Sequence, residues 1–136
     1  SQKIALHLRR GDYLSLDGYG ILGNDYYSTA KKYIINKFND CETIAFSDEI
    51  ENLKNNNEIK ADYYFDDRSM DSKKVLAYMS TCDHFITANS TFSWWAAYLG
   101  DKSHKVIVTP KKWFISRDKT PDLIPNNWVS IENKHY

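Results

Sequence analysis

Apolar and polar residues alternate along the chain in short blocks, and the lengths of these blocks predict both strands and helices. The first strand is expected over residues 3–8, where Ile4, Ala5 and Leu6 form a continuous apolar run. Such a run, bounded by polar residues, is typical of a strand buried on both faces. Further strands are expected over residues 42–47, 59–65, 84–88 and 106–109, with a last short strand or turn over 128–131.

Helical spacing of apolar residues fills the segments between these strands. A cap at Asn24 or Asp25 opens the first helix, in which apolar residues recur up to Phe38. The other helices are expected from Asp48 to residues 55–57, from Ser69 or Asp71 past Met79, and over residues 90–99 up to Gly100. Strands that alternate with helices predict an α/β domain, Rossmann-like, with a mainly parallel sheet covered by helices on both faces.

The totals fit one globular domain and exclude some partners. The chain has 136 residues, of which 42% are hydrophobic and 26% charged, and its formal net charge is zero. A balanced charge does not support a general attraction to nucleic acid or to an anionic membrane, so any anion site has to be local. Cys41 and Cys82 are too few for a disulfide framework or a zinc site and are expected to be free thiols.

Two of the four arginines stand side by side directly after the first strand. Arg9 and Arg10 follow Leu8, and their planar guanidinium groups suit bidentate contacts with phosphate. Because successive strand side chains point to opposite sides, at most one of them faces a given pocket. The alternative is a surface salt bridge to Asp12 or Asp48, and the adhesion tripeptide formed by residues 10–12 is a weaker third interpretation.

A second cluster of polar residues opens the helix expected over residues 90–99. It consists of Asn89, Ser90, Thr91 and Ser93, with Phe92 between them, directly after a predicted strand. Free N–H groups at a helix start, together with hydroxyl groups, form an anion site. Helix capping by Asn89 or Ser90 explains one of these residues but leaves the others without a role.

Paired acids and histidines complete the set of candidate groups. The two acid pairs, residues 48–49 and 66–67, could hold Mg²⁺ beside a diphosphate, but without a third ligand they are better explained as caps at helix starts. His7 lies inside a strand close to Arg9 and is a plausible site residue, whereas His84 is expected to be structural. The glycine patterns of phosphate-binding and dinucleotide-binding loops are absent from the sequence.

Taken together, the motifs of the chain resemble those of the α-1,2-fucosyltransferase family, glycosyltransferase family 11. The opening motif, His-x-Arg-Arg-Gly-Asp-Tyr, is met by residues 7–13, and a strand that ends in Ser-Asp-acid is met by residues 46–49. The long signature of the family is met by residues 79–97, MSTCDHFITANSTFSWWAA, and the closing strand with Pro-Lys-Lys-Trp-Phe by residues 106–114. The motifs occur in order and cover nearly the whole chain.

The resemblance implies a two-domain GT-B enzyme of which residues 1–136 form the single C-terminal, GDP-fucose-binding domain, with the N-terminal domain outside the chain. It implies inverting transfer of L-fucose to a glycan hydroxyl in α-1,2 linkage without a metal ion or other cofactor, and the chain alone is expected to be inactive. Arg9 is expected to bind the β-phosphate, and Asp12 and Asp17 are candidates for the general base. The donor-binding residues implied are His7, Arg9, Arg10, Asp48, Asp71, Asn89, Ser90, Thr91, Phe92 and Ser93.

One position departs from the family pattern. Related fucosyltransferases carry an acid seven residues before the cysteine, where it helps to read guanine, and this chain has Val75 there. Asp71, one helical turn earlier, is the candidate replacement. The alternative function is a nucleotide- or carbohydrate-binding module without turnover. The abundance of Lys, Asn, Ile and Tyr favours a bacterial, cytoplasmic parent protein, with the Golgi lumen as the location if the parent is eukaryotic.

Overall fold

A computed structural model of the chain describes residues 2–8, 23–48, 59–68, 71–100, 105–111, 124–125 and 127–132. The strands are β1 (Gln2–Leu8), β2 (Cys41–Ser47), β3 (Tyr63–Asp66), β4 (His84–Ile86), β5 (Ile107–Pro110) and β6 (Val129–Ile131). The helices are α1 (Asn24–Phe38), α3 (Ser72–Ser80) and α4 (Thr91–Gly100). The helix expected after Asp48 falls on residues 49–58, which lie outside the described residues.

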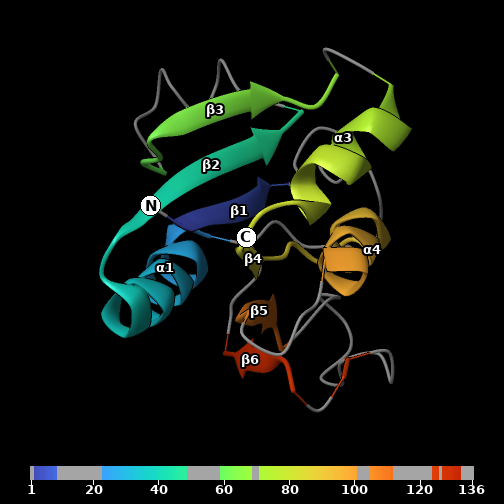
Figure 1. Cartoon of the computed structure of the whole chain (residues 1–136). Coiled ribbons are helices and arrows are strands. Elements are labelled where there is room, and N and C mark those ends of the chain that lie inside the picture. Colours follow the sequence, from blue (N-terminus) through green and yellow to red (C-terminus); the bar gives the residue numbers. More distant parts are fainter. Residues whose placement is uncertain are drawn as a thin grey trace.

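The six strands form one parallel sheet in the order β3-β2-β1-β4-β5-β6. Figure 1 shows α1 on one face of this sheet and α3 and α4 on the other. The α/β class, the parallel sheet and the helices on both faces are therefore confirmed. The chain starts in the centre, moves outward through β2 and β3, and returns to the other side of β1 with β4, so the strand order reverses between β1 and β4.

Alternate residues of the central strands belong to two separate hydrophobic cores. Ile4, Leu6 and Leu8 of β1 pack with α1, whereas Ala5 packs with α3 and α4. Because successive side chains of a strand point to opposite faces, His7 shares the face of Ala5, toward α3 and α4. The apolar residues of β1 are at most 1% exposed, as expected of a central strand covered on both sides.

Two buried tyrosines of α1 fasten this helix to the ends of the central strands. The Tyr27 hydroxyl donates to the His7 carbonyl at 2.8 Å, and the Tyr26 hydroxyl donates to the Thr87 carbonyl at 2.7 Å. Burial raises the pKa of Tyr26 well above its ordinary value of 10.0. Both hydroxyls therefore hold the backbone at the carboxyl ends of β1 and β4, where the strand order reverses.

The third strand is shorter than the expected span of residues 59–65. The Tyr64 hydroxyl donates to the Ile59 carbonyl at 3.0 Å and accepts from the Ala61 N–H at 3.2 Å. These bonds turn the chain back on itself before β3, so the strand begins at Tyr63. The fourth strand also ends early, at Ile86, because the Ala88 N–H is bonded to the Ser93 hydroxyl instead of a neighbouring strand.

Gly100 is the last residue of α4, as the sequence predicts. A Cβ atom at this position would collide with the Ser80 carbonyl oxygen of α3 and with the Phe85 ring. The close approach of α4 to α3 and β4 therefore requires glycine here.

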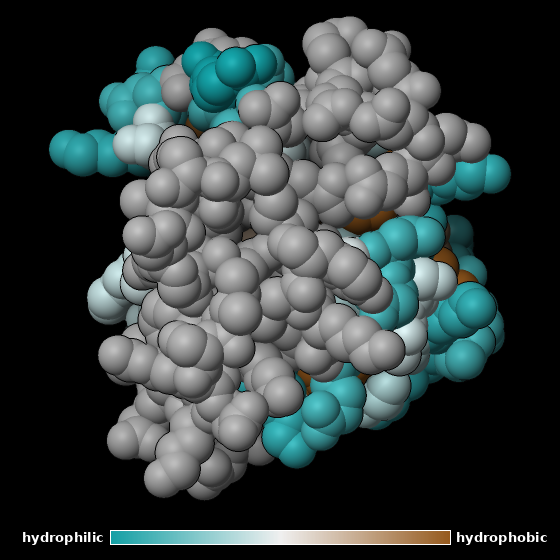
Figure 2. Space-filling view, turned by 180° about the vertical axis from the view of Figure 1, so that it is seen from behind, coloured by the Kyte–Doolittle hydropathy of each residue, from teal (hydrophilic) through white to brown (hydrophobic). Residues whose placement is uncertain are grey.

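On the side of the molecule seen from behind the view of Figure 1, the described residues visible in Figure 2 are mainly hydrophilic, with apolar surface limited to small patches between them. None of the described helices is long and apolar enough to cross a bilayer.

Both cysteines are free, as expected, and Cys82 is buried. Burial raises the pKa of the Cys82 thiol from 9.0 to about 11. Below pH 9 the thiol is neutral in the folded and unfolded states. Between about pH 9 and pH 11 only the unfolded state loses the proton, so the free energy of unfolding should fall by about 2–3 kcal/mol.

Cys82→Ala should remove this part of the alkaline destabilisation, which urea unfolding at a series of pH values will measure. Cys41→Ala is the comparison: partial burial, with Asp40, also raises the pKa of the half-buried Cys41, so this variant should remove a smaller part of the alkaline loss. If Cys82→Ala and the wild-type protein lost stability equally between pH 9 and pH 11, the thiol would not be the cause.

Candidate functional site

The carboxyl ends of β1 and β4 lie side by side where the strand order reverses. Open α/β sheets bind ligands in the crevice at this position. Leu6 of β1 pairs with Ile86 of β4, so His7 and Thr87 are the next residues on the two strands. The predicted arginines follow β1 directly. Arg9 and Arg10, like Asp12 and Asp17, lie outside the described residues.

His7 and Thr87 are buried polar residues at this end of the sheet, and their side-chain polar groups have no hydrogen-bond partner among the described residues. His7 is 0% and Thr87 1% exposed. Within the described part of the chain, neither ring nitrogen of His7 nor the hydroxyl of Thr87 has a hydrogen-bond partner. Buried polar groups without partners are costly and are found where a ligand or another group supplies the missing bond. The Thr43 and Thr109 hydroxyls are unpaired in the same way among the described residues. The role of His7 as a site residue therefore stays a prediction, and Thr87 is a further candidate because of its place at the end of β4.

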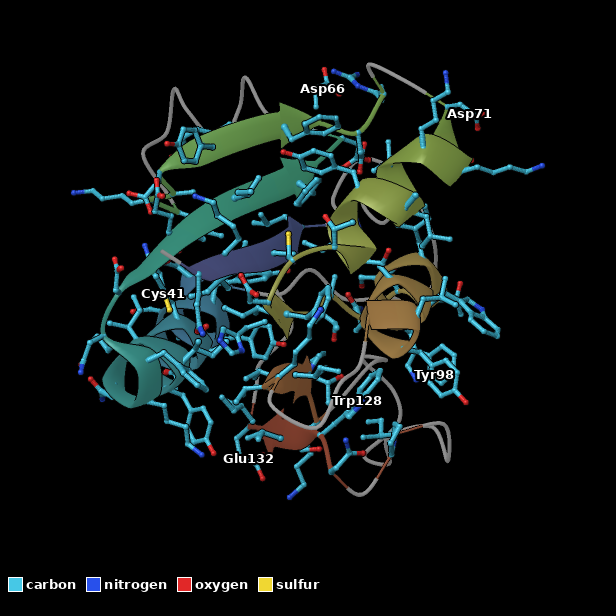
Figure 3. The ribbon with its side chains drawn as sticks, in the orientation of Figure 1. Cys41, Asp66, Asp71, Tyr98, Trp128 and Glu132 are labelled. Carbon is cyan, nitrogen blue, oxygen red and sulfur yellow. The ribbon has the colours of Figure 1, made fainter. Side chains whose placement is uncertain are left out.

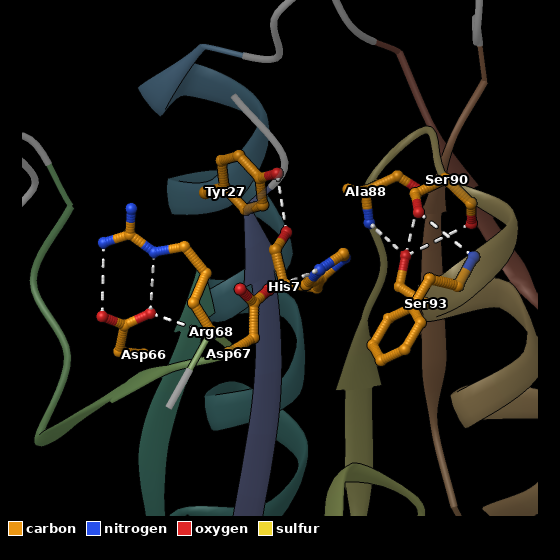
Figure 4. A network of polar contacts seen from close by, with 9 residues as sticks. His7, Tyr27, Asp66, Asp67, Arg68, Ala88, Ser90 and Ser93 are labelled. Atoms are coloured by element: carbon orange, nitrogen blue, oxygen red, sulfur yellow. Dashed lines mark hydrogen bonds and ion pairs between the residues drawn. The ribbon is translucent and has the colours of Figure 1, made fainter. Parts of the chain in front are cut away.

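The start of α4 lies beside this pair, and the hydroxyl groups of its serines bond to the backbone of the helix start. Ser90 is the cap, because its hydroxyl accepts from the Phe92 N–H at 3.1 Å, and the Ser93 hydroxyl accepts from the Ala88 N–H at 3.1 Å (Figure 4). The Phe92 ring lies 5.7 Å from the His7 ring, measured between centroids. Capping thus explains both serines, and their direct contact with a ligand stays a prediction.

Asn89 and Thr91 differ in exposure at the same helix start. Asn89 is 1% exposed, whereas Thr91 is exposed. An exposed hydroxyl at the first position of a helix remains accessible to a ligand that approaches the helix N-terminus. The structure thus places Phe92, at this helix start, against the His7 ring, and a role of Asn89, Ser90, Thr91 and Ser93 in donor binding stays a prediction.

The acids lie along the same edge of the sheet, and the predicted helix cap is wrong for the 66–67 pair, whereas the helix expected after Asp48 lies outside the described residues. Asp48 follows β2, and Asp66 ends β3. The 66–67 pair does not cap a helix, because α3 begins at Ser72 and its cap is Asp71. Figure 3 shows Asp66 and Asp71 at the same end of the molecule. No group of three His, Cys, Asp or Glu side chains within the described residues is placed to hold a metal ion.

Asp66 forms a pair with the next arginine along the chain. The Arg68 Nε donates to Asp66 Oδ1 at 3.2 Å, and a second guanidinium nitrogen donates to Oδ2 at 3.3 Å. The Arg68 guanidinium holds the pKa of the Asp66 carboxyl below its ordinary value. This pairing occupies Asp66 and leaves Asp67 directed elsewhere (Figure 4).

Val75 does not face the crevice as a base-reading residue would. It is 0% exposed and packs in the core between α3 and the sheet. Asp71, the candidate replacement, is exposed, and its carboxylate accepts from the Lys73 N–H at 3.0 Å as the cap of α3. Capping explains Asp71 structurally, so its contact with guanine stays a prediction.

The sequence did not reveal that Asp67 lies beside His7. Asp67 Oδ2 is 3.7 Å from His7 Nε2, and the Asp67 side chain is 12% exposed. The two residues are 60 positions apart, and the approach depends on β3 and β1 both ending at the same edge of the sheet. The parallel-sheet prediction implied that edge, but the strand order needed to place the pair was not predicted.

The tryptophans of α4 divide between the core and the surface. Trp94 packs against the core beside Trp128, with ring centroids 5.9 Å apart. Trp95 is 50% and Tyr98 51% exposed, and Figure 3 shows Tyr98 pointing away from the sheet. Trp94 therefore contributes to the core, whereas Trp95 and Tyr98 lie largely at the surface.

The arrangement suits a ligand that combines a polar ring system with anionic groups. The crevice offers buried hydrogen-bonding side chains from β1 and β4, and a helix start that favours anions. The base of a nucleotide needs hydrogen-bonding side chains, and its phosphates need a group that favours anions, such as a helix start. The residues at the switch point would therefore suit a nucleotide-type ligand.

Comparison with known proteins agrees with this interpretation. Residues 1–132 match the family model of Glycosyl transferase family 11. The chain is 34% identical over 133 residues to the O-antigen biosynthesis glycosyltransferase WbnK of Escherichia coli, covering 93% of this chain and 44% of the relative. It is 33% identical over 146 residues to an alpha-1,2-colitosyltransferase of Escherichia coli, covering 97% and 48% respectively. The chain thus spans slightly less than half the length of these relatives.

Proposed function

Because the chain belongs to glycosyl transferase family 11, we propose that it is the donor-binding domain of a transferase that uses GDP-fucose. The observation that carries the proposal is the switch-point crevice, where His7, Thr87 and the start of α4 meet. The remainder of the enzyme, a second domain, supplies much of the surface for the glycan acceptor. The acceptor hydroxyl attacks the anomeric carbon of fucose, and GDP leaves with the electron pair of the broken bond.

Charge stabilisation on the departing GDP is the main contribution of this domain. Breaking the bond between sugar and phosphate places negative charge on the β-phosphate, and Arg9 stabilises that charge more in the transition state than in the ground state. The N–H groups at the start of α4 add to the positive potential at the diphosphate. With these groups in place the transfer proceeds without a metal ion. Direct attack inverts the anomeric carbon, with Asp12, Asp17 or the second domain removing the proton.

The name of one relative adds a second candidate for the donor sugar. One relative is named a colitosyltransferase with α-1,2 specificity, so a colitosyl donor is the second candidate, and α-1,2 linkage is proposed for both. A nucleotide- or carbohydrate-binding module without turnover is the remaining alternative.

A donor assay on the full-length protein separates these possibilities. The full-length protein is incubated with glycan acceptors and GDP-fucose, a colitosyl nucleotide or UDP-galactose, with and without EDTA. Released nucleotide and the anomeric configuration of the product are measured by chromatography and NMR. We expect β-linked GDP-fucose to yield an α-linked product at a rate that EDTA does not change. Transfer from the colitosyl donor alone would make colitose, and not fucose, the donor sugar. Nucleotide binding without any transfer would favour the binding module.

A further inference from the structure

The two buried histidines of the sheet differ in their hydrogen bonding. His84 Nδ1 accepts from the Val106 N–H at 3.0 Å, so its Nε2 carries the proton and donates to Gln2 Oε1 at 2.7 Å. Both nitrogens of His84 are thus used within the fold. His7 is equally buried, yet neither of its ring nitrogens has a hydrogen-bond partner in the described residues. Among the described residues, both ring nitrogens of His7 therefore remain open to a further hydrogen bond.

Asp67 is the charged group nearest to the His7 ring in the described structure. Its Oδ2 lies 3.7 Å from Nε2, slightly beyond hydrogen-bonding distance. The Asp67 N–H donates to the Ser47 carbonyl at 3.0 Å, which holds the residue at the end of β2. Asp66 is engaged by Arg68, so the two neighbouring carboxylates have different partners. Figure 4 shows the imidazole between the Asp67 carboxylate and the start of α4.

We propose that Asp67 is a positioning residue for donor binding, which keeps the proton of His7 on Nε2 and thereby presents Nδ1 to the nucleotide of the donor. A carboxylate beside one ring nitrogen favours the proton on that nitrogen and fixes the orientation of the ring. This inference rests on the proposed function, because it assigns His7 to the nucleotide. Asp67 acts through His7 and does not itself touch the donor.

The test uses the full-length protein and the neighbouring acid as a matched control. Asp67→Asn keeps the shape of the side chain and removes its charge, and Asp66→Asn does the same one residue earlier. GDP binding is measured by calorimetry for both variants and in a His7→Gln background. We expect Asp67→Asn to weaken GDP binding on the order of tenfold, Asp66→Asn to stay within about twofold, and the Asp67 effect to vanish when His7 is replaced.

A spectroscopic measurement keeps the inference testable if a variant fails to fold. In wild-type protein labelled with ¹⁵N-histidine, the signals of His7 are assigned with His7→Gln and report which ring nitrogen carries the proton. We expect a protonated Nε2, and loss of that preference in Asp67→Asn but not in Asp66→Asn. A neutral His7 protonated on Nδ1 in the wild type would overturn the inference.

The outcomes also separate this inference from the proposed function. If wild-type protein binds GDP and Asp67→Asn binds it equally well, only the positioning role is overturned. If folded wild-type protein binds no GDP or GDP-fucose, the proposed function fails and the positioning role fails with it. An Asp67 effect of the same size with and without His7 would show that Asp67 acts by another route.

Discussion

Replacing Arg9 with alanine is expected to lower kcat/KM of the full-length enzyme for its GDP-sugar donor by about 10²–10³-fold. Arg9 directly follows Leu8, the last residue of β1, whose carboxyl end borders the crevice. The departing GDP gains negative charge on its β-phosphate as the bond to the sugar breaks. Without the guanidinium group that charge loses a stabilising partner that acts mainly in the transition state, so kcat should fall more than KM rises. Initial rates over a range of donor concentrations measure both constants.

Arg68→Ala is the matched control for this change. The Arg68 side chain is 66% exposed and pairs with Asp66 at the end of β3. Removing an exposed pair of this kind should leave kcat/KM within about twofold of the wild type. Arg10→Ala is a second comparison, because the sequence predicts that the two neighbouring arginines point to opposite sides, so only one of them should carry the large effect. Equal effects of Arg9→Ala and Arg68→Ala would remove Arg9 from the phosphate site.

The largest effect on stability is expected from Phe46→Ala. Phe46 of β2 is 0% exposed and is the register partner of His7. Its ring contacts Phe65 at 5.3 Å and Tyr78 of α3 at 5.7 Å between centroids. Truncation removes the ring and leaves a cavity between the sheet and α3, so the free energy of unfolding should fall by about 3–5 kcal/mol. Urea unfolding followed by circular dichroism measures this loss.

Tyr78→Ala provides the comparison for the same aromatic cluster. Its ring stacks on Phe65 at 5.3 Å but is 46% exposed. Because part of this ring is already in water, its removal should cost only about 1 kcal/mol. If the two variants lost equal amounts of unfolding free energy, the ring contacts with α3 would determine the stability here, and the cavity left by Phe46 would not.

The class of the fold could be predicted because its signals are local. The apolar runs that became β1, β2, β4 and β5, and the helical spacing from Asn24 to Phe38, are visible within single segments. The start of β3 could not be predicted in the same way. It is set by the hydroxyl of Tyr64 bonding to the backbone of Ile59 and Ala61, a contact that propensity does not encode.

The site could be predicted only in part, because its geometry depends on contacts between distant segments. The polar cluster after β4 and His7 in β1 were visible as departures from an apolar pattern. The approach of Asp67 to His7 requires the strand order β3-β2-β1, which alternation of elements does not determine. Asp67 was instead grouped with Asp66 as a helix cap, and Thr87 was counted as an ordinary strand residue.

Calorimetric titration of the full-length protein with GDP tests the central claim, that the crevice between β1 and β4 is a site for a guanine nucleotide. The titration is repeated with the Arg9→Ala variant and in the presence of EDTA, which removes metal ions. ADP and UDP are titrated as the competing nucleotides. The account predicts GDP binding that EDTA does not change, that exceeds binding of ADP and UDP, and that Arg9→Ala weakens by at least tenfold. Equal binding of GDP and ADP would remove the preference for guanine, and folded protein that binds none of the three nucleotides would contradict the account.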